Sequence, residues 1–424
     1  MILRVGRFET VNLIQLLTKF IFLSGSNILG MLASFGVVLL IVDSFGAEGL
    51  GKMALVLSVI HYCTLLSGQG IEMYAIREVS AKRQDLAEMV PSLFVVRFLA
   101  AVVIYVGMSI LVVLVPSFNE QSNLFIIFGL TLLILPFRSA WAAQARHDAH
   151  VLGLFNLSIE LTYLLGVLVV TAFSLTLTNV AWVKVGTECI VTVSLVLWIH
   201  KRYGPLRKPL SWNKLKIMMG LAWPFASFPL LRGVALGTDL IILSFFVSTS
   251  DVGIYSGAAK LFFVLLSLTS AYFVIVYPRL SELSHLSIKA AHAEVIRLYK
   301  VILPLAFMGV FFMLLFSDFI LTLLFGSEFS SGSLSLQFLT VAFIANLAAR
   351  HYRQLLLVAQ HQKIDFNINI LVAIIHVLIK LILIPLWGIE GAALGTAVGE
   401  TILLLAYLIV DRHLFRKAWV VSRR

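Results

Sequence analysis

The stretch HKRYGPLRKPLSWNKLK, residues 200–216, is the longest connection in a chain of 424 residues whose remaining sequence is dominated by apolar runs. Six of its side chains are Lys or Arg. Apolar runs of about twenty residues, long enough for a helix to cross the hydrocarbon core of a membrane, recur on both sides of it. The basic connection therefore divides the chain into two groups of membrane-spanning segments.

The apolar runs predict twelve membrane-spanning helices, six before the connection and six after it. Their ranges are 20–42, 53–76, 90–115, 124–143, 151–173, 180–199, 217–247, 252–276, 301–325, 334–359, 366–387 and 391–410. Hydrophobic residues make up 60% of the chain and charged residues 12%, whereas roughly 25% of the residues in a soluble protein are charged. The chain is therefore expected to be an all-α polytopic membrane protein.

Lys and Arg gather in every second connection, notably in residues 77–83, 201–216 and 279–300, and in both terminal segments. The other connections carry almost none. By the positive-inside rule both termini are expected in the cytoplasm. The net charge of +11 is then a signal of topology and of attraction to anionic lipid head groups, and no nucleic-acid partner is expected.

Two stretches that each follow an expected outer loop resemble one another. FGAEGLGKMALVL and DVGIYSGAAKLFF align Gly49 with Gly253 and Ala54 with Ala258, an offset of 204 residues. Internal repeats are typical of transporters whose working site lies between the two repeats. The sequence predicts two six-helix lobes around a central cavity, with lobe one in residues 1–200, a basic cytoplasmic linker in 201–216, and lobe two in 217–424.

The stretch GAEGLGKM, residues 46–53, comes close to a phosphate-binding loop, but Met53 stands where the motif needs Ser or Thr. The sequence contains no other nucleotide signature and no catalytic constellation. His61 and His376 are each isolated on an apolar helix and are expected to be core residues. The chain is therefore expected to be a transporter rather than an enzyme, without a cofactor or metal.

Charged groups inside the expected spans cost about 2.5–3.5 kcal/mol each at the membrane centre, so they must face one another or a wet cavity. Lys184 and Glu188 are one helical turn apart and are expected to pair, whereas Arg138 is expected to extend to the cytoplasmic interface. In LLRGVALGTDLIILSFF, residues 230–246, Arg232 and Asp239 lie two turns apart on one helix face, too far for direct contact. The charged residues within the spans include Arg97, Arg138, Glu160, Lys184, Glu188, Arg232, Asp239, Lys260, Lys380 and Glu400.

Two interpretations of these charges stay open: interhelical ion pairs that stabilise the bundle, or a lumen in which cations bind an anionic substrate. Arg and Lys in a partly desolvated cavity suit phosphate or diphosphate groups. The candidate substrate-binding residues are Arg97, Arg232, Lys260 and Lys380. The candidate ion-coupling or gating residues are Asp239, Glu160 and Glu400. Two prolines and two glycines in the seventh span also make it a candidate moving element.

Several short stretches resemble the polysaccharide-exporter proteins, the O-antigen flippases of the multidrug/oligosaccharidyl-lipid/polysaccharide exporter superfamily. They are FGAEGLGKMAL (45–55), SDVGIYSGAAKL (250–261), VYPRLSEL (276–283), LFGSEFSSGSLSLQFL (324–339) and GIEGAALGTAVGE (388–400). The resemblance implies two lobes around a cationic cavity. It also implies movement of an undecaprenyl-pyrophosphate-linked oligosaccharide from the cytoplasmic to the periplasmic leaflet of a bacterial inner membrane. A polysaccharide polymerase and chain-length machinery are then expected partners.

Two alternatives remain. A multidrug or organic cation antiporter shares the twelve-span fold, but a cationic lumen counts against it. A non-transporting membrane scaffold for glycan assembly predicts that replacing Arg232 or Lys380 with alanine leaves surface polysaccharide intact. Lipid II flippases of the same superfamily typically have fourteen spans and arginines in the first helices. This chain has twelve expected spans and no arginine in the first two before Arg77.

Overall fold

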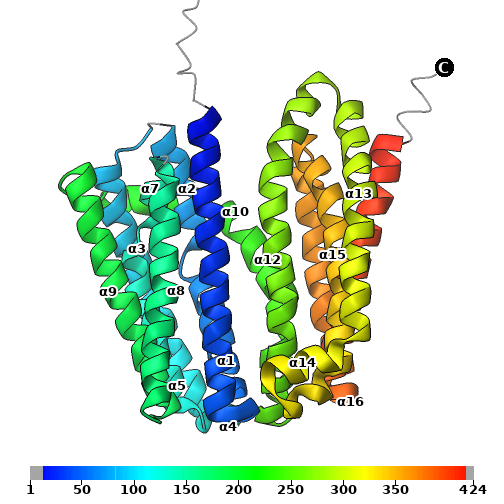
Figure 1. Ribbon diagram of the computed structural model, residues 1–424. Helices are drawn as coiled ribbons and strands as arrows, with labels where there is room; N and C mark the ends of the chain where they lie inside the picture. The colour runs from blue at the N-terminus through cyan, green and yellow to red at the C-terminus, as the bar shows by residue number, and fades with distance from the viewer. Residues whose placement is uncertain (1–12, 82, 147, 417–424) are drawn as a thin grey trace, which may run out of the picture.

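The computed structural model describes residues 13–81, 83–146 and 148–416, and within these residues the chain is helical, with no strand. Figure 1 shows the helices in two groups that run side by side. We call α1 to α9 the N half and the remaining helices the C half. Long apolar segments with internal backbone hydrogen bonds are the structures that a membrane permits, so the helical content follows from the composition.

The N half begins with α1 (Leu13–Leu66), which turns back on itself at Gly46, where φ is +64°. A non-glycine residue seldom adopts this backbone conformation. Three long helices, α3 (Leu86–Leu114), α8 (Ala149–Ala172) and α9 (Leu177–Tyr203), follow among shorter ones. The shorter elements are α2 (Gln69–Ser80), α4 (Pro116–Asn119), α5 (Ser122–Gly129), α6 (Thr131–Ile134), η1 (Leu135–Phe137) and α7 (Ala140–Ala145).

The C half ends with α16 (Gln362–Asp411), which turns back at Gly388, where φ is +53°. Its first helix, α10 (Trp212–Gly237), is interrupted at Thr238 and continues as α11 (Asp239–Leu243). The other elements are α12 (Thr249–Leu286), α13 (Ile288–Leu315), α14 (Ser317–Phe325), η2 (Ser327–Gly332), α15 (Ser333–Val358) and the π-helical turn η3 (Arg412–Arg416).

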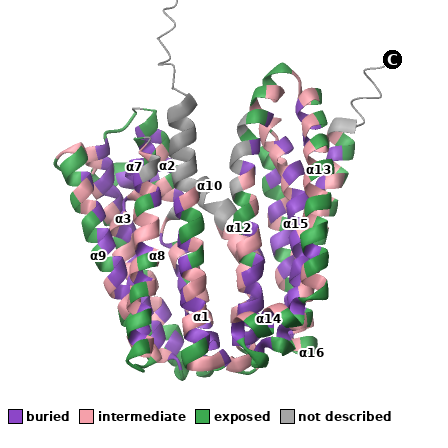
Figure 2. Cartoon of the chain, viewed as in Figure 1, coloured by how far each residue is buried: buried purple, intermediate pink, exposed green. Residues whose placement is uncertain are grey.

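Nine helices in the described part of the chain are long and apolar enough to cross a membrane. Two of them, α1 and α16, each contain two antiparallel arms joined at a glycine, and α10 with α11 supplies one further segment. The prediction of an all-α polytopic membrane protein with twelve spans is thereby confirmed. Exposed Leu, Val and Phe side chains cover the outer faces of helices such as α3 and α13, as expected where lipid surrounds a protein (Figure 2).

The two halves come into direct backbone contact at one end of the bundle, which we call the turn end because α1 and α16 each turn back there (Figure 1). Away from this end, α10 also packs on α2 and on the second arm of α1. We call the opposite end, where α1 begins and α16 ends, the terminal end. At the turn end the backbone of Gly51 packs on the carbonyl of Thr249, and that of Gly253 packs on the carbonyl of Ala47. A Cβ atom would not fit at either glycine. These contacts join the two stretches that the sequence aligned as a repeat.

Candidate functional site

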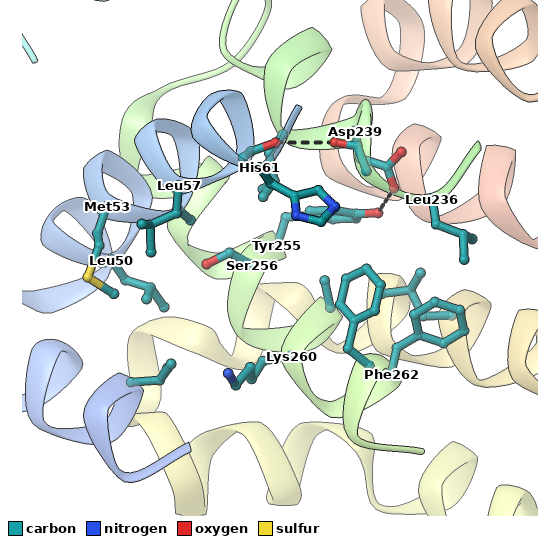
Figure 3. A pocket seen from close by; sticks show the side chains of 18 of the residues that line it. Leu50, Met53, Leu57, His61, Leu236, Asp239, Tyr255, Ser256, Lys260 and Phe262 are labelled. Atoms are coloured by element: carbon teal, nitrogen blue, oxygen red, sulfur yellow. Dashed lines mark hydrogen bonds between the residues drawn. The ribbon is translucent and has the colours of Figure 1, made fainter. Parts of the chain in front are cut away.

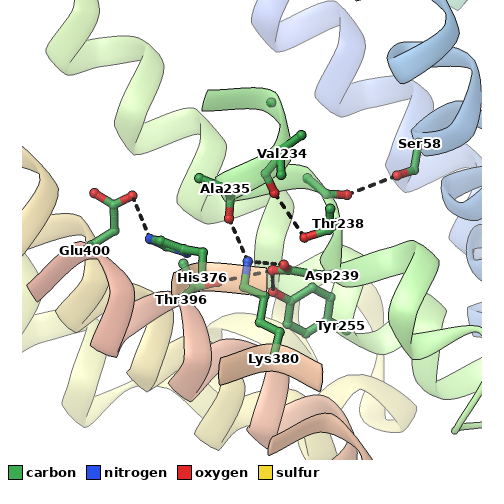
Figure 4. Close-up of polar contacts among 12 residues, drawn as sticks. Ser58, Val234, Ala235, Thr238, Asp239, Tyr255, His376, Lys380, Thr396 and Glu400 are labelled. Carbon is green, nitrogen blue, oxygen red and sulfur yellow. Dashed lines mark hydrogen bonds and ion pairs between the residues drawn. The ribbon is translucent and has the colours of Figure 1, made fainter. Parts of the chain in front are cut away.

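The break between α10 and α11 places Asp239 in a buried ion pair with Lys380 of α16 (Figure 4). The Tyr255 hydroxyl donates a hydrogen bond to the same carboxylate, and the Thr396 hydroxyl donates another at 3.2 Å. The Lys380 side chain is fully buried. A buried charge is costly unless it is paired and hydrogen-bonded, and both charges meet that condition here.

Several backbone carbonyls in the last turns of α10, next to this break, accept hydrogen bonds from side chains. Lys380 donates to the carbonyl of Ala235 at 2.7 Å, so its ammonium lies at the negative end of a helix. Tyr62 and Ser58, from the second arm of α1, donate to the carbonyls of Gly233 and Gly237 at 2.8 and 3.2 Å. The interrupted helix is therefore held from both halves of the protein.

A second ion pair joins α10 to α16 closer to the terminal end. Arg232 Nη2 lies 3.0 Å from Glu400 Oε1, and Asn346 donates to Glu400 Oε2 at 2.7 Å. The ring of His376 lies 3.7 Å from the same carboxylate. The Glu400 side chain is fully buried, whereas 19% of the Arg232 side chain is exposed. Arg232 and Asp239 therefore each contact another helix rather than each other.

Glycines in the second arm of α16 make room for the side chains of Lys380 and His376, which belong to its first arm. A Cβ atom at Gly395 would lie 2.9 Å from Cγ of Lys380, and one at Gly399 would overlap the ring of His376. Gly391 packs against the backbone of Leu383 in the same way. Small residues at intervals of four let membrane helices approach closely, and here the space is filled by a lysine and a histidine from the facing arm.

A large cavity, with a volume of about 760 Å³, lies between the halves. It is lined from α1, α8, α9 and α12, and from the break between η1 and α7. Two cations and two carboxylates face it together with hydroxyl and amide groups. The charged lining residues are Arg138, Lys184, Glu160 and Glu188, and the neutral polar ones are Ser26, Asn27, Ser34, Thr64, Asn156, Ser267 and Ser270.

Arg138 was expected to extend to the membrane interface, and this expectation was wrong. The residue follows η1, where Pro136 ends the preceding helix, so its side chain turns into the cavity. Arg138 Nη2 donates to Asn156 at 2.8 Å, and Nη1 lies 3.8 Å from Glu188. Lys184 lies 3.2 Å from Glu188, which confirms the expected pair. Glu188 thus balances two cations.

Arg97 faces a neighbouring cavity of about 280 Å³, where it pairs with Glu72 at 2.5 Å. This cavity shares Arg138 and Asn156 with the larger one. Only 6% of the Arg97 side chain is exposed. The two cavities form a continuous polar lining that runs from the centre of the protein into the N half.

A third cavity, of about 460 Å³, lies toward the turn end and is largely apolar (Figure 3). Asp239 and His61 line it, as does Lys260, which donates to Ser34 at 2.9 Å. Because Ser34 lines the 760 Å³ cavity, Lys260 lies at the boundary between the polar and the apolar spaces. His61 is exposed rather than a core residue.

The structure divides the expected charged residues between ion pairs of the C half and cavity walls. Two ion pairs lie within the C half, Asp239 with Lys380 and Arg232 with Glu400, and Asp239 also lines the 460 Å³ cavity. Arg97, Glu160 and Lys260 each face a cavity. Arg350 was not among the expected residues, although it lies within the expected span 334–359. Its guanidinium donates to Ser270 at 2.9 Å and to Thr269 at 3.3 Å, beside the large cavity.

Solved structures with the same architecture are membrane transporters. The lipid II flippase MurJ in an inward closed conformation aligns with a TM-score of 0.74 and 13% identity, over 92% of this chain and 87% of that chain. An inward-facing multidrug resistance MATE family transporter of the MOP superfamily aligns with a TM-score of 0.71 and 14% identity, over 91% and 93%. A MOP superfamily transporter from Pyrococcus furiosus gives 0.63 and 12%, over 93% and 95%. These identities show a shared fold.

Sequence comparison identifies the family directly. No curated protein sequence matches the chain. The family described as "Polysaccharide biosynthesis protein" matches residues 16–284, which is more than half of the chain. The matched region covers the N half and the beginning of the C half, including α10, α11 and nearly all of α12. The chain is a multi-pass membrane protein that belongs to this polysaccharide biosynthesis family.

Proposed function

We propose that the chain is a flippase that moves an undecaprenyl-pyrophosphate-linked oligosaccharide from the cytoplasmic to the periplasmic leaflet of a bacterial inner membrane. The observation that carries this proposal is the polar 760 Å³ cavity between the halves, with Arg138 and Lys184 on its wall. Ligand cavities are typically about 300–1,000 Å³ in volume. A cavity of this size accommodates a diphosphate and the first sugars attached to it.

The chemistry of the cavity suits a glycosyl diphosphate. Guanidinium and ammonium groups form charge-assisted hydrogen bonds with phosphate oxygens, and these strengthen as water is excluded. In the free protein Glu188 and Asn156 hold Arg138 and Lys184 in place. An arriving diphosphate competes with Glu188 for both cations, while serine hydroxyls and asparagine amides are available for sugar hydroxyl groups. Arg97 and Lys260, at the two ends of the polar lining, are proposed to contact the same head group.

The direction of opening follows from the charge asymmetry of the connections. By the positive-inside rule we assign the terminal end to the cytoplasm, as expected for both termini from the sequence. Asn27, Ser267 and Ser270 are exposed members of the cavity wall, while the halves are in contact at the turn end. On this assignment we propose that the protein in this state receives the head group from the cytoplasm. Residues 1–200 and 217–424 are proposed to rock as two lobes joined by the linker 201–216.

The lipid tail needs an apolar path beside the polar head. The 460 Å³ cavity adjoins the polar one at Lys260 and is lined by Leu50, Met53 and Phe262. We place the first isoprene units of the tail there, with the rest of the tail in lipid. Ion coupling through Glu160 or Glu400, and association with a polysaccharide polymerase and chain-length machinery, belong to the same proposal. Asp239, the third candidate from the sequence, is held in its ion pair with Lys380.

A reconstituted flipping assay tests the function. Vesicles that contain the purified protein and a lipid-linked oligosaccharide are treated with an externally added glycosidase, and the fraction of lipid that becomes accessible is followed over time. Transfer across the bilayer in protein-containing vesicles but not in empty ones is expected. Transport of small organic cations without movement of the lipid would instead identify an antiporter, and transport of neither substrate would favour a scaffold.

Substitutions in the cavity test the site. We expect Arg138→Gln and Lys184→Gln each to lower the flipping rate by about 10-fold or more, since each removes a charge-assisted hydrogen bond of about 1.5–3 kcal/mol. Arg279→Gln is the matched control, because Arg279 is 60% exposed and pairs with Glu294 outside the cavity. An unchanged rate in both cavity variants, with normal yield and melting temperature, would exclude this site.

A further inference from the structure

The ammonium of Lys380 lies where a free cation could bind. Its neighbours are the carboxylate of Asp239 and the carbonyl oxygen of Ala235, with the Tyr255 and Thr396 hydroxyls on the far side of the carboxylate (Figure 4). The lysine side chain is fully buried. The set of oxygen atoms that contact the ammonium consists of one carboxylate oxygen of Asp239 and one carbonyl oxygen of the broken helix, while the two hydroxyl groups bind the other carboxylate oxygen.

Such sets have a general role in membrane transporters. Interrupted helices expose backbone carbonyls at the negative ends of their dipoles, and these carbonyls, together with carboxylates, coordinate sodium ions or protons. Small monovalent and divalent cations of this hard type prefer oxygen ligands. In this chain the break at Thr238 supplies the carbonyl of Ala235 and Asp239 supplies the carboxylate, but a covalently attached cation already occupies the space between them.

We propose that Lys380 is a tethered counter-ion that permanently fills a monovalent-cation site and so makes transport by this chain independent of sodium. Its charge neutralises Asp239 without any ion entering or leaving. Lys380 is then a specificity-determining residue for the coupling ion rather than a contact of the substrate. This assignment differs from the role that the sequence suggested for Lys380.

The packing around the lysine stem supports a fixed occupant. Gly395 leaves room for the stem, since any larger residue there would press on Cγ. The ammonium has hydrogen-bonding partners on α10 and α11, so it links the interrupted helix to α16. The lysine therefore excludes other cations in two ways, because it fills the space and because its positive charge repels them. Lys380→Ala, which removes the side chain beyond Cβ, removes both obstacles.

The first experiment measures cation binding directly and does not depend on the flippase assignment. The purified Lys380→Ala variant is expected to bind radioactive sodium, and about 0.1 M NaCl, compared with N-methylglucamine chloride, should raise its apparent melting temperature by about 2 °C or more. The wild-type protein should show neither effect. Sodium binding by the wild-type protein, or no sodium response in a folded Lys380→Ala variant, would overturn the proposal.

Two control variants separate charge from volume. Lys380→Met removes the charge but fills most of the space, and Lys380→Ala combined with Asp239→Asn opens the space but removes the carboxylate. Neither should respond to sodium. A sodium response in either control as large as that of Lys380→Ala would place the bound ion elsewhere and would contradict the proposal. If Lys380→Ala is recovered only when NaCl is present throughout purification, that sodium requirement supports it.

The second experiment measures transport and rests on the proposed function. In the flipping assay the wild-type rate should be the same when external and internal sodium are both replaced by N-methylglucamine. A sodium-gradient dependence of the wild-type rate would overturn the tethered counter-ion even if flipping is confirmed. If the protein flips no lipid, the function fails, while the sodium-binding comparison still decides the role of Lys380.

Discussion

Opposite charges on one helix need not be partners, and Arg232 and Asp239 illustrate why. Both lie on the side of α10 and α11 that faces α16, where Glu400 and Lys380 meet them. Each pair joins two different helices, so the four charges cancel across the interface between them. The buried ion-pair interpretation of these residues is thus the one that the geometry favours within the C half.

The Arg232–Glu400 pair should respond unequally to loss of its two members. Arg232→Met removes the cation that directly contacts a fully buried carboxylate and leaves that carboxylate in contact with Asn346 and His376, so we expect a loss of about 3–5 kcal/mol in the free energy of unfolding. Glu400→Gln leaves a partly exposed guanidinium, and the loss should be about 1–3 kcal/mol. Denaturant titration in detergent micelles measures both values.

The double variant completes the comparison. Arg232→Met combined with Glu400→Gln removes both charges, so it should be more stable than Arg232→Met alone by about 1–2 kcal/mol. Equal losses in the two single variants, or simple additivity in the double variant, would show that the pair does not form in the folded protein.

The partners of these charges could not be predicted from the sequence. Residue counting placed Arg232 and Asp239 on one helix face, because the helical repeat is local. Glu400 and Lys380 are 168 and 141 residues away along the chain, and nothing in the local pattern specifies which spans become neighbours. Arg138 is different, since Pro136 two residues earlier signalled a helix break that would turn the arginine inward.

At the scale of elements, α16 is a helical hairpin whose two arms are held together by glycines. Gly391, Gly395 and Gly399 stand opposite Leu383, Lys380 and His376, respectively. The close approach is what allows a lysine and a histidine to be buried between the arms. The stretch GIEGAALGTAVGE therefore has a structural meaning beyond its resemblance to a family.

We expect Gly391→Ala to destabilise the protein although alanine is the better helix former. Its Cβ would overlap the backbone carbonyl of Leu383, and the arms would have to separate. Gly309→Ala is the matched control, because a Cβ at that position of α13 meets nothing within 4 Å. On propensity alone Gly309→Ala should be neutral or stabilising by up to about 1 kcal/mol. Melting temperatures of the two variants should therefore move in opposite directions, and a fall of equal size in both would contradict the close packing of the hairpin.

The elements themselves followed well from the sequence, with informative exceptions. Runs of apolar residues predicted twelve spans because a membrane demands about twenty such residues in a row. The expected span 124–143 is not one helix but a series of short ones, α5, α6, η1 and α7, with Pro136 in η1 between α6 and α7. The expected span 217–247 is interrupted at Thr238, where the sequence shows only Gly237 as a local sign. Apolar length determines that a segment crosses the membrane but not where its helix breaks.

At the scale of the whole molecule, the two halves are closed against each other at the turn end. The glycines at positions 51 and 253 bring α1 and α12 into backbone contact, and the rings of Phe35 and Phe325 lie 5.8 Å apart. Glu328, from the C half, accepts a hydrogen bond from the backbone N–H of Ala47 at 2.9 Å. Any state that opens at the turn end must break these contacts.

The contact between Glu328 and Ala47 offers a way to shift the equilibrium between protein that is closed and protein that is open at the turn end. Ala47 follows the turn at Gly46 and begins the second arm of α1, so its N–H has no partner within its own helix and a carboxylate there acts as a cap. Glu328 is exposed, and the contact should contribute about 1 kcal/mol. Glu328→Ala should therefore increase the population of protein that is open at the turn end by about five-fold, if the closed state predominates.

A cysteine behind the closed end reports this change. Ala54 lines the apolar cavity, and Ala54→Cys is placed in a chain with Cys63 and Cys189 replaced by serine. The rate of labelling by a membrane-impermeant maleimide, applied from the side of the turn end, should rise about five-fold when Glu328→Ala is added. Glu120→Ala is the matched control, because it removes another exposed carboxylate from the turn end between α4 and α5 and should leave the rate unchanged. Equal rates with and without Glu328 would mean that the contact does not hold the halves together, and closure would then rest on the glycine crossing and the aromatic packing alone.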